Sequence, residues 1–400
     1  MKSYFIPFCL LLLVSACSPS SALIGEESDK QWYKGNLHTH SFWSDGDDFP
    51  EMIMQWYRDH DYQFVGLSDH NTLQEGEKWT KVSNNLLREE TFQKYQKAFE
   101  SDWVESKTDT AGTFVKLKTL DEYRSRFEKE EEFLILKSEE ITDSYDGKPV
   151  HMNATNIKSR IEPRHGNSMV EVLQNNINAV LEQREATGQP MFPHINHPNF
   201  GWAMTAEDLK QLKGERFFEV YNGHPAVHNY GDSARLGTEA MWDIINHHYL
   251  KNDQELMLGL ATDDSHNYHT FGPQYSNTGR GWVMVSSEEL SPEALIRNLE
   301  AGNFYASTGV SLIKFGLRQN EYIVEVSPEP NVQYQIQIMV WLEGDEQATL
   351  MEPVSANKNT YQLSGRELFI RAKITSDRLQ ENPFQAGDYE SAWTQPVIIN

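Results

Sequence analysis

The feature that most constrains the fold is a recurring unit, a short apolar segment that ends in histidine or carboxylate residues. Helix-like segments separate most of these units, and such alternation is typical of an α/β protein. In a β/α barrel the carboxyl ends of the strands share one mouth, so we expect the polar ends to gather there. The strand-like segments are residues 36–40, 63–70, 133–142, 150–156, 190–194, 216–222 and 256–262.

The first unit carries the clearest ligand pattern. His38 and His40 stand two residues apart, and residues at that spacing in a strand point to the same face. Asp45 follows beside Gly46, where the backbone can bend. Imidazole and carboxylate together suit a divalent metal. Alone, the pattern also fits a strand end with solvated histidines, but the later units favour the metal site.

The later units supply the same residue types. One connection departs from the alternation, because residues 143–149 are too short for a helix and contain Asp146-Gly147, a tight-turn pair. We therefore expect the third and fourth strands to form a hairpin and any barrel to be irregular. The polar residues at the later strand ends are Asp69, His70, Glu140, His151, His194, His197, Glu219, Asn222, Asp264 and His266.

The N-terminal residues have the form of an export signal. Lys2 precedes an apolar run that is too short to cross a bilayer, and the run ends in Val14-Ser15-Ala16-Cys17. This resembles the lipobox of bacterial lipoproteins, so we expect residues 1–17 to be a signal peptide, Cys17 to be lipidated and residues 18–30 to be a flexible tether. The expected location is the bacterial cell envelope, lipid-anchored with Ser18 favouring the outer membrane, or periplasmic or extracellular. An ordinary secretory signal is the alternative.

The rest of the chain divides into two parts. Residues 31–311 contain the strand-like units, interrupted by a charged stretch at about 75–132 that we expect to be a helical insertion, either solvated or a lid. Residues 312–400 alternate apolar and polar positions, which predicts a small all-β, sandwich-like domain with a final edge strand at 393–399. The net charge of −24 disfavours nucleic acid as a partner.

Several motifs together resemble those of the PHP (polymerase and histidinol phosphatase) superfamily of metal-dependent hydrolases. They are Leu37-His38-Thr39-His40, Leu67-Ser68-Asp69-His70-Asn71, Glu140-Ile141-Thr142, His197-Pro198 and Asp264-Ser265-His266. Residues 219–223, 299–305 and 392–396 are similar to the carbaryl-hydrolase-like (CehA/McbA) branch. The resemblance implies a distorted (β/α)7 barrel. It also implies nine ligands for two or three divalent ions, Zn, Mn or Fe: His38, His40, Asp45, His70, Glu140, His151, His197, Asp264 and His266.

The resemblance further implies that Glu140 bridges two ions. His38, His40 and Asp264 would complete one site, His151 and His197 a second, and Asp45, His70 and His266 the third. Two neighbours remain open as replacements, His194 for His197 and Glu139 for Glu140.

Four further residues are assigned roles around the ions. Asp69 is expected to act in catalysis by orienting a neighbouring ligand. Arg280, in a Gly-rich turn, is expected to grip phosphate oxygens, although a surface role fits it equally. His194 and Asn222 are expected to contact substrate at the mouth.

The function expected is that of a metal-dependent hydrolase acting on a small, anionic ester. A phosphoesterase that uses a metal-bridged hydroxide is favoured. The same metals would serve a carboxyl or carbamate ester hydrolase. A third reading, from a different class, is a non-catalytic surface-binding lipoprotein whose β-sandwich does the binding.

Overall fold

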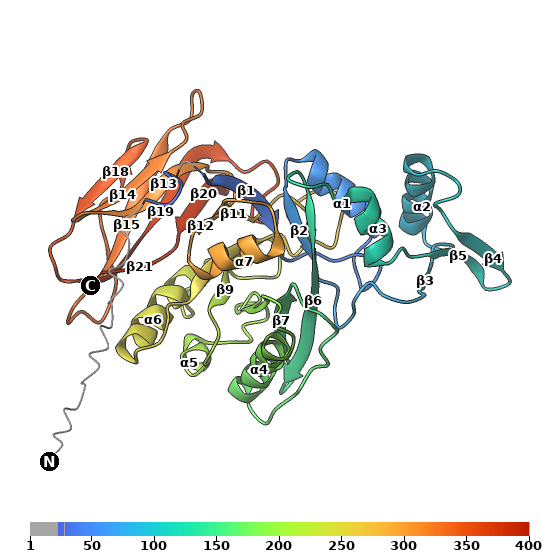
Figure 1. Ribbon diagram of the computed structural model, residues 1–400, viewed down its shortest axis with the longest axis horizontal. Helices are drawn as coiled ribbons and strands as arrows, with labels where there is room; N and C mark the ends of the chain where they lie inside the picture. Colours follow the sequence, from blue (N-terminus) through green and yellow to red (C-terminus); the bar gives the residue numbers. More distant parts are fainter. Residues whose placement is uncertain (1–22, 28, 400) are drawn as a thin grey trace, which may run out of the picture.

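A computed structural model describes residues 23–27 and 29–399, and Cys17 with the rest of the expected signal lies outside them. The fold is mixed α/β with one large sheet (Figure 1). The seven predicted strands are neighbours in this sheet, in the order β10-β9-β8-β7-β6-β2-β1. They are β1 (Gln31–Asn36), β2 (Phe64–Leu67), β6 (Leu134–Tyr145), β7 (Lys148–Thr155), β8 (Phe192–Ile195), β9 (Phe217–Asn222) and β10 (Leu258–Thr262).

The predicted hairpin between the third and fourth of these strands is confirmed. β6 and β7 pair antiparallel up to Tyr145↔Lys148, and the turn residues Asp146 and Gly147 have φ of 49° and 71°. The β1–β2, β2–β6, β8–β9 and β9–β10 pairs are parallel, whereas β7 is antiparallel to β8 as well. Just beyond the ends of β1 and β10, a parallel bridge Thr39↔Ser265 brings the first and seventh strands together. The ligand-bearing ends are therefore held at one end of the sheet.

Three of the helices between the strands begin at a residue whose side chain accepts a hydrogen bond from the first turn. Ser168 accepts a hydrogen bond from the Glu171 N–H at the start of α4 (Met169–Thr187), and Gly188 ends it in the left-handed conformation, at φ 68°. Figure 1 shows α4 lying along β7. The other helices of this part are α1 (Pro50–Asp59), α5 (Ala206–Leu209), α6 (Thr238–Lys251) and α7 (Pro292–Glu300). In the described residues, every helix is too short or too polar to span a bilayer.

The composition of the insertion predicted helices, but the structure shows strands in it as well. Three of its segments pair into a separate small sheet in the order β3-β5-β4, and this sheet and α2 project away from the C-terminal strands (Figure 1). Trp43 donates a hydrogen bond from its indole N–H to the Lys118 carbonyl at 3.0 Å, which ties the insertion to the loop after β1. Its elements are β3 (Trp79–Lys81), α2 (Leu86–Ala98), β4 (Ser106–Asp109), β5 (Gly112–Lys116) and α3 (Leu120–Phe127).

The C-terminal part is joined to the first part by continuous hydrogen bonding. Sequence analysis missed β11 (Trp282–Ser287) and β12 (Phe304–Ser307), which extend the sheet from β1 through β11 and β12 to β20. The predicted final edge strand at 393–399 is confirmed only in part, because residues 393 and 394 belong to β20, which lies between β12 and β19, whereas residues 397 and 398 pair with β19 alone. The remaining strands of this sheet are β15 (Tyr334–Leu342), β16 (Thr349–Leu350), β17 (Val354–Ser355), β19 (Glu367–Leu379), β20 (Tyr389–Thr394) and β21 (Val397–Ile398).

A second, three-stranded sheet faces the end of the large one. It consists of β13 (Leu312–Arg318), β14 (Glu321–Val326) and β18 (Lys358–Gln362). Buried apolar residues of both sheets form one core, to which Tyr305 and Ile370 of the large sheet and Phe315 and Val324 of the small one contribute. Because Tyr305 precedes residue 312, the core crosses the boundary that sequence analysis had placed there.

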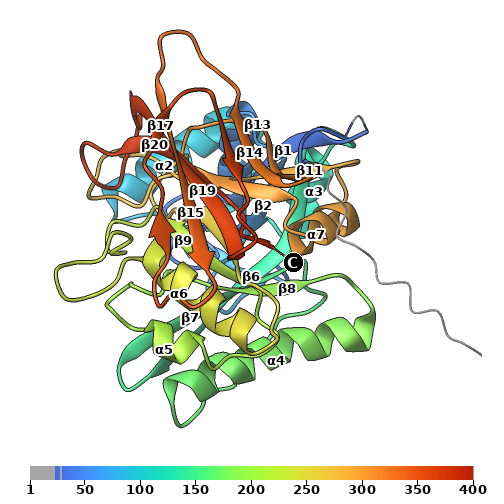
Figure 2. The ribbon, with the colours of Figure 1, turned by 90° about the vertical axis from the view of Figure 1, so that its left-hand side faces the viewer.

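A buried ion pair also joins the two parts. Arg371 of β19 is 1% exposed and donates two hydrogen bonds of 2.7 Å to the Asp243 carboxylate of α6. A third, of 3.1 Å, goes to Glu239. Figure 2 shows β15 and β19 crossing the molecule next to α6.

We expect Arg371→Met to lower the free energy of unfolding by about 3–5 kcal/mol, because it leaves the Asp243 carboxylate buried without its partner. Lys358→Met is the matched control, since Lys358 is 53% exposed and 3.7 Å from Glu325, and we expect about 0–1 kcal/mol there. Urea denaturation measures both. Equal small losses in the two variants would show that the buried pair does not hold the parts together.

Candidate metal centre

All nine predicted ligands come together around Glu140, which is fully buried in β6. His38 and His40 follow β1, and His70 follows β2. His151 lies near the start of β7, which is antiparallel to β6, and this direction brings it to the same end of the sheet. Asp45, His197, Asp264 and His266 come from the loops after β1, β8 and β10.

The two carboxylate oxygens of Glu140 face different histidines. Oε2 lies 3.4 Å from His38 Nε2, 3.2 Å from His40 Nε2 and 3.0 Å from His70 Nδ1. Oε1 lies 3.0 Å from His151 Nδ1, with His197 Nε2 at 3.7 Å. A carboxylate that offers one oxygen to each of two histidine groups has the geometry needed to bridge two ions.

Asp264 closes the site from the β10 side. Its Oδ1 lies 3.2 Å from His38 Nε2 and 3.3 Å from His40 Nε2. Its backbone has φ of 49°, a left-handed conformation that costs free energy in a residue with a Cβ. Asn222 donates to Asp264 Oδ2 at 3.1 Å and Ser276 Oγ donates to the Asp264 carbonyl, so both contacts hold the residue in this strained position.

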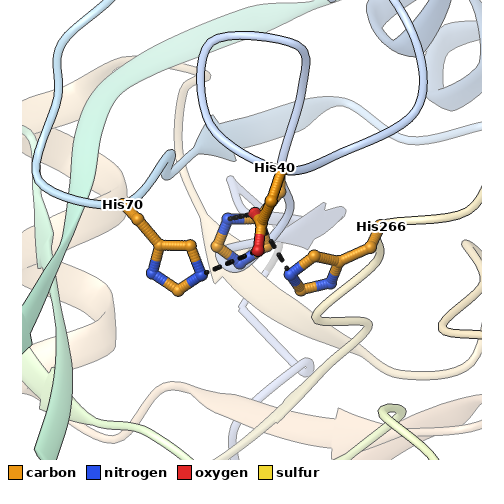
Figure 3. Close-up of side chains that lie close together, drawn as sticks. His40, His70 and His266 are labelled. Atoms are coloured by element: carbon orange, nitrogen blue, oxygen red, sulfur yellow. Dashed lines mark ion pairs between the residues drawn. The ribbon is translucent and has the colours of Figure 1, made fainter.

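A third group surrounds Asp45 at the more exposed side of the site. Its two oxygens lie 3.6 Å from His70 Nε2 and 3.5 Å from His266 Nε2. Figure 3 shows the His70 and His266 rings converging on His40. The ring centroids of His70 and His266 lie 4.5 and 4.1 Å from that of His40. The arrangement offers a nitrogen- and oxygen-lined position separate from the one at His38.

Unpaired buried atoms show that the residues fit metal ions. His38 Nε2, both ring nitrogens of His40 and Glu140 Oε2 are buried and receive no hydrogen bond from any described residue. Leaving such polar atoms unpaired is costly. Divalent cations bound between them would remove that cost, and nitrogen with carboxylate oxygen suits Zn, Mn or Fe.

Two buried polar residues orient these ligands, and sequence analysis gave neither of them that role. Glu219 Oε1 accepts a hydrogen bond of 2.7 Å from His38 Nδ1, so in the neutral ring the proton is on Nδ1 and Nε2 is the nitrogen that faces Glu140 and Asp264. Asn196 donates to Glu140 Oε1 at 2.8 Å. Both residues stand inside motifs at strand ends, so their position was a usable signal.

The charges in the cluster shift the pKa values of its members. Burial alone would raise the pKa of Glu140, but His70 and His38 hold it well below its usual range. Burial would lower the pKa of His70, yet the Glu140 carboxylate raises it to about 9. Burial together with the charges on His266 and His70 lowers the pKa of His40 to about 3. Without metal the site thus keeps its carboxylates ionised.

The structure contradicts the phosphate-gripping role of Arg280. The residue is 1% exposed, and its guanidinium N–H groups donate to the carbonyls of Gly223, Gly272, Tyr275 and Asn382 at 2.5–2.9 Å. All of its strong hydrogen-bonding capacity is used inside the protein. Arg280 therefore holds loops together and has no donor left for a substrate.

Two other roles also change. His194 and Asn222 are fully buried and do not line the pocket, so the predicted substrate contacts are wrong. His194 Nε2 lies 3.4 Å from Glu219, behind His38. Asp69 accepts four hydrogen bonds, from Ser41 N, Ser41 Oγ, Ser44 Oγ and Gln74 Nε2, so it fixes the loop that carries His40 and Asp45, in keeping with the expected orienting role.

Of the two open alternatives, the structure favours the residues first chosen. Glu139 points away from the cluster and accepts a hydrogen bond of 2.5 Å from Ile161 N–H. Burial raises the pKa of Glu139 to about 7. His197 Nε2 lies 3.8 Å from Asp264 Oδ2, within the cluster, whereas His194 lies behind it.

A pocket of about 630 Å³ opens onto the ligands. Phe200, His224, Pro225 and Gln274 line it beside the metal-binding side chains. None of the described lining residues belongs to the insertion at 75–132, so the insertion is not a lid in this conformation.

Comparisons with known proteins found loosely similar structures. No protein-family model and no curated protein matches the chain. A two-domain Bacteroides vulgatus protein containing a predicted PHP-like metal-dependent phosphoesterase is 13% identical with a TM-score of 0.41, covering 93% of this chain and 96% of that one. A candidate metal-dependent phosphoesterase from Bifidobacterium adolescentis is 12% identical, with a TM-score of 0.30 and coverage of 58% and 87%. A Chromobacterium violaceum amidohydrolase, with bound sulfate and no metal, is 13% identical, with a TM-score of 0.30 and coverage of 68% and 96%. Likenesses of this degree do not place the chain in a family.

We expect Glu140→Ala to lower the content of two metal ions together, because its two oxygens face two histidine groups. Asp45→Ala should lower the content of one, and Glu139→Ala, whose carboxylate points away, should leave the metal content unchanged. Elemental analysis of the purified variants measures this. Loss of metal in Glu139→Ala with full content in Glu140→Ala would reverse the assignment.

Metal affinity should rise with pH between about 6.5 and 9. In the metal-free protein the pKa of His70 is raised to about 9, so over this range the folded protein holds a proton that the unfolded chain has released. That proton stabilises the fold below pH 6.5, and the stabilisation is lost as pH rises to 9. A bound ion must displace the proton at lower pH. Calorimetric titration of metal across this range, with His70→Gln as comparison, tests the trend, and a flat profile would contradict it.

Proposed function

We propose that the protein is a metal-dependent hydrolase of the PHP type, acting on ester bonds, with phosphoesters as the favoured substrates. The observation that supports this is the bridging arrangement of Glu140, with buried ring nitrogens left unpaired around it. On this proposal the seven strands are a distorted (β/α)7 barrel, the C-terminal part is a sandwich-like module, and two or three ions are bound.

The ligand groups then divide among the ions as the PHP resemblance implies. When bound, the ions would supply Lewis acidity, which acidifies water and neutralises charge on the ester. The protein's own part is to fix and orient the ligands: Glu219 sets the tautomer of His38, and Asn196 holds Glu140. The open pocket above them admits the substrate.

A carboxyl or carbamate ester hydrolase is the second candidate, and one observation favours it. None of the described residues lining the pocket is lysine or arginine, and Arg280 is fully engaged elsewhere. Phosphoryl transfer leaves charge on several oxygens, whereas acyl transfer leaves it on one, which metal ions satisfy without a cationic clamp.

Removal and return of metal test the enzyme proposal. We expect chelator-treated protein to lose at least about 10²-fold in kcat/KM on its best ester and to regain it with Zn, Mn or Fe(II). Assays on phosphomonoesters, phosphodiesters and carboxyl esters separate the two candidates. Glu139→Ala should behave as wild type. A fully metal-loaded, folded protein that hydrolyses none of these esters would leave the non-catalytic binding lipoprotein as the better account.

We also propose that Cys17 anchors the protein in the bacterial envelope through lipid, supported only by the sequence before it. Expression with a labelled fatty acid should label the wild type but not Cys17→Ser, and the variant should leave the membrane fraction. An unlabelled, soluble wild-type protein would contradict the anchor.

A further inference from the structure

The pocket wall that faces the ligands is neutral and partly apolar. Its non-ligand residues include Phe200, His224, Pro225, Ala226 and Gln274. Among the described residues that line it, the positively charged side chains of lysine and arginine are missing. Any charge on the substrate must therefore be met by the metal ions.

Phe200 and His224 are placed together by the backbone. A main-chain bridge Phe200↔Val227 ties the segment after β8 to the segment that carries His224. The ring centroid of Phe200 lies 5.0 Å from that of His197 and 5.4 Å from that of His224. The His224 centroid lies 5.7 Å from that of His266. The two side chains thus form a wall that runs from one ligand group to the other.

His224 is held in one tautomer. The Ala226 N–H donates to His224 Nδ1 at 3.1 Å, so the proton of the neutral ring is on Nε2. The His224 N–H donates to Asn222 Oδ1 at 2.8 Å, which fixes the start of this segment. Because Nδ1 accepts the hydrogen bond from Ala226, it carries no proton and the ring is neutral. His224 therefore offers one uncharged N–H donor.

Arg280 keeps this segment in place. Its Nη1 donates to the Gly223 carbonyl at 2.8 Å. A Cβ on Gly223 would come within 2.8 Å of the Arg280 Cβ, so only glycine allows the close approach. Arg280, which was expected to bind phosphate, thus positions the wall next to the ligands.

We propose that this wall selects a phosphodiester with an apolar or aromatic ester group, in preference to a phosphomonoester. The inference rests on the proposed metal-dependent hydrolase. A diester carries one negative charge and two terminal oxygens, which the metal ions can take. A dianionic monoester presents a third charged oxygen that calls for a cationic donor. The second ester group of a diester needs an apolar surface, which Phe200 and Pro225 supply.

In this arrangement the role of His224 differs from that of Phe200. A neutral N–H donor suits a bridging ester oxygen, where negative charge is partial, better than a fully charged terminal oxygen. Phe200 packs against the ester group and His224 Nε2–H donates to its bridging oxygen. Both residues determine specificity, and neither binds metal.

Non-hydrolysable probes test the wall without relying on activity. Diphenylphosphinate is a monoanion with two terminal oxygens and two rings, phenylphosphonate is a dianion with three oxygens, and dimethylphosphinate lacks rings. For metal-loaded protein, calorimetry should show diphenylphosphinate binding about tenfold more tightly than either of the others. Phe200→Ala should weaken the binding of diphenylphosphinate about tenfold and that of dimethylphosphinate less than about twofold. Its metal content should equal that of the wild type. Tighter binding of phenylphosphonate, or an unchanged Phe200→Ala, would overturn the proposal.

Rates of hydrolysis test the role of the His224 N–H donor. They also distinguish a failure of this inference from a failure of the proposed hydrolase function. The kcat/KM for bis(4-nitrophenyl) phosphate should exceed that for 4-nitrophenyl phosphate at least about tenfold, and His224→Ala should lower it about tenfold. His224→Gln, which keeps an N–H donor, should retain most of it. His228→Gln is the control, because His228 stacks on Trp202 outside the pocket lining. Preference for the monoester would overturn the inference but leave the hydrolase standing. If the probes bind as expected but no ester is hydrolysed, the proposed selectivity of the wall is supported and the proposed hydrolase function is contradicted.

Discussion

The buried carboxylate of Glu140 is the constraint on which the rest of the site depends. An ionised group with no exposure is very unfavourable unless positive charge surrounds it. Here five histidine nitrogens lie within 3.7 Å of its two oxygens, delivered by the ends of three strands, β1, β2 and β8, and by β7. The β6–β7 hairpin and the bridge between Thr39 and Ser265 both serve to bring those nitrogens to one place.

Much of this could be predicted from the sequence, because local patterns carry it. The strand ends with His, Asp or Glu were visible as short apolar segments, and the hairpin was visible in its Asp146-Gly147 turn. Ser168 and Gly188 are residue types that favour helix ends, and α4 begins and ends beside them. Periodicity and turn chemistry act over a few residues, so a single sequence is enough to show them.

What could not be predicted depends on partners far apart in the chain. β20 looked like an edge strand, yet β12 and β19 pair with both of its sides. Arg280 looked like an anion-binding residue in a flexible turn, yet carbonyls of three separate segments surround it. Glu219 was recognised as a strand end, but its role depends on His38, which precedes it by 181 residues. Whether a charged side chain faces a pocket or a carbonyl is decided by tertiary packing, which the local pattern does not contain.

The contact between Arg280 and the Asn382 carbonyl also has a consequence for the order of folding. Residues 380–388 brace the pocket wall from the C-terminal part, where Phe384 packs on Tyr221 and Gln380 accepts from its hydroxyl. During synthesis, the segment that carries His224 emerges well before these residues do. The ligands can meet early, but the wall beside them cannot settle until nearly the whole chain is available. A chain that folds as it is synthesised could thus bring the nine clustered side chains together before the wall beside them is complete.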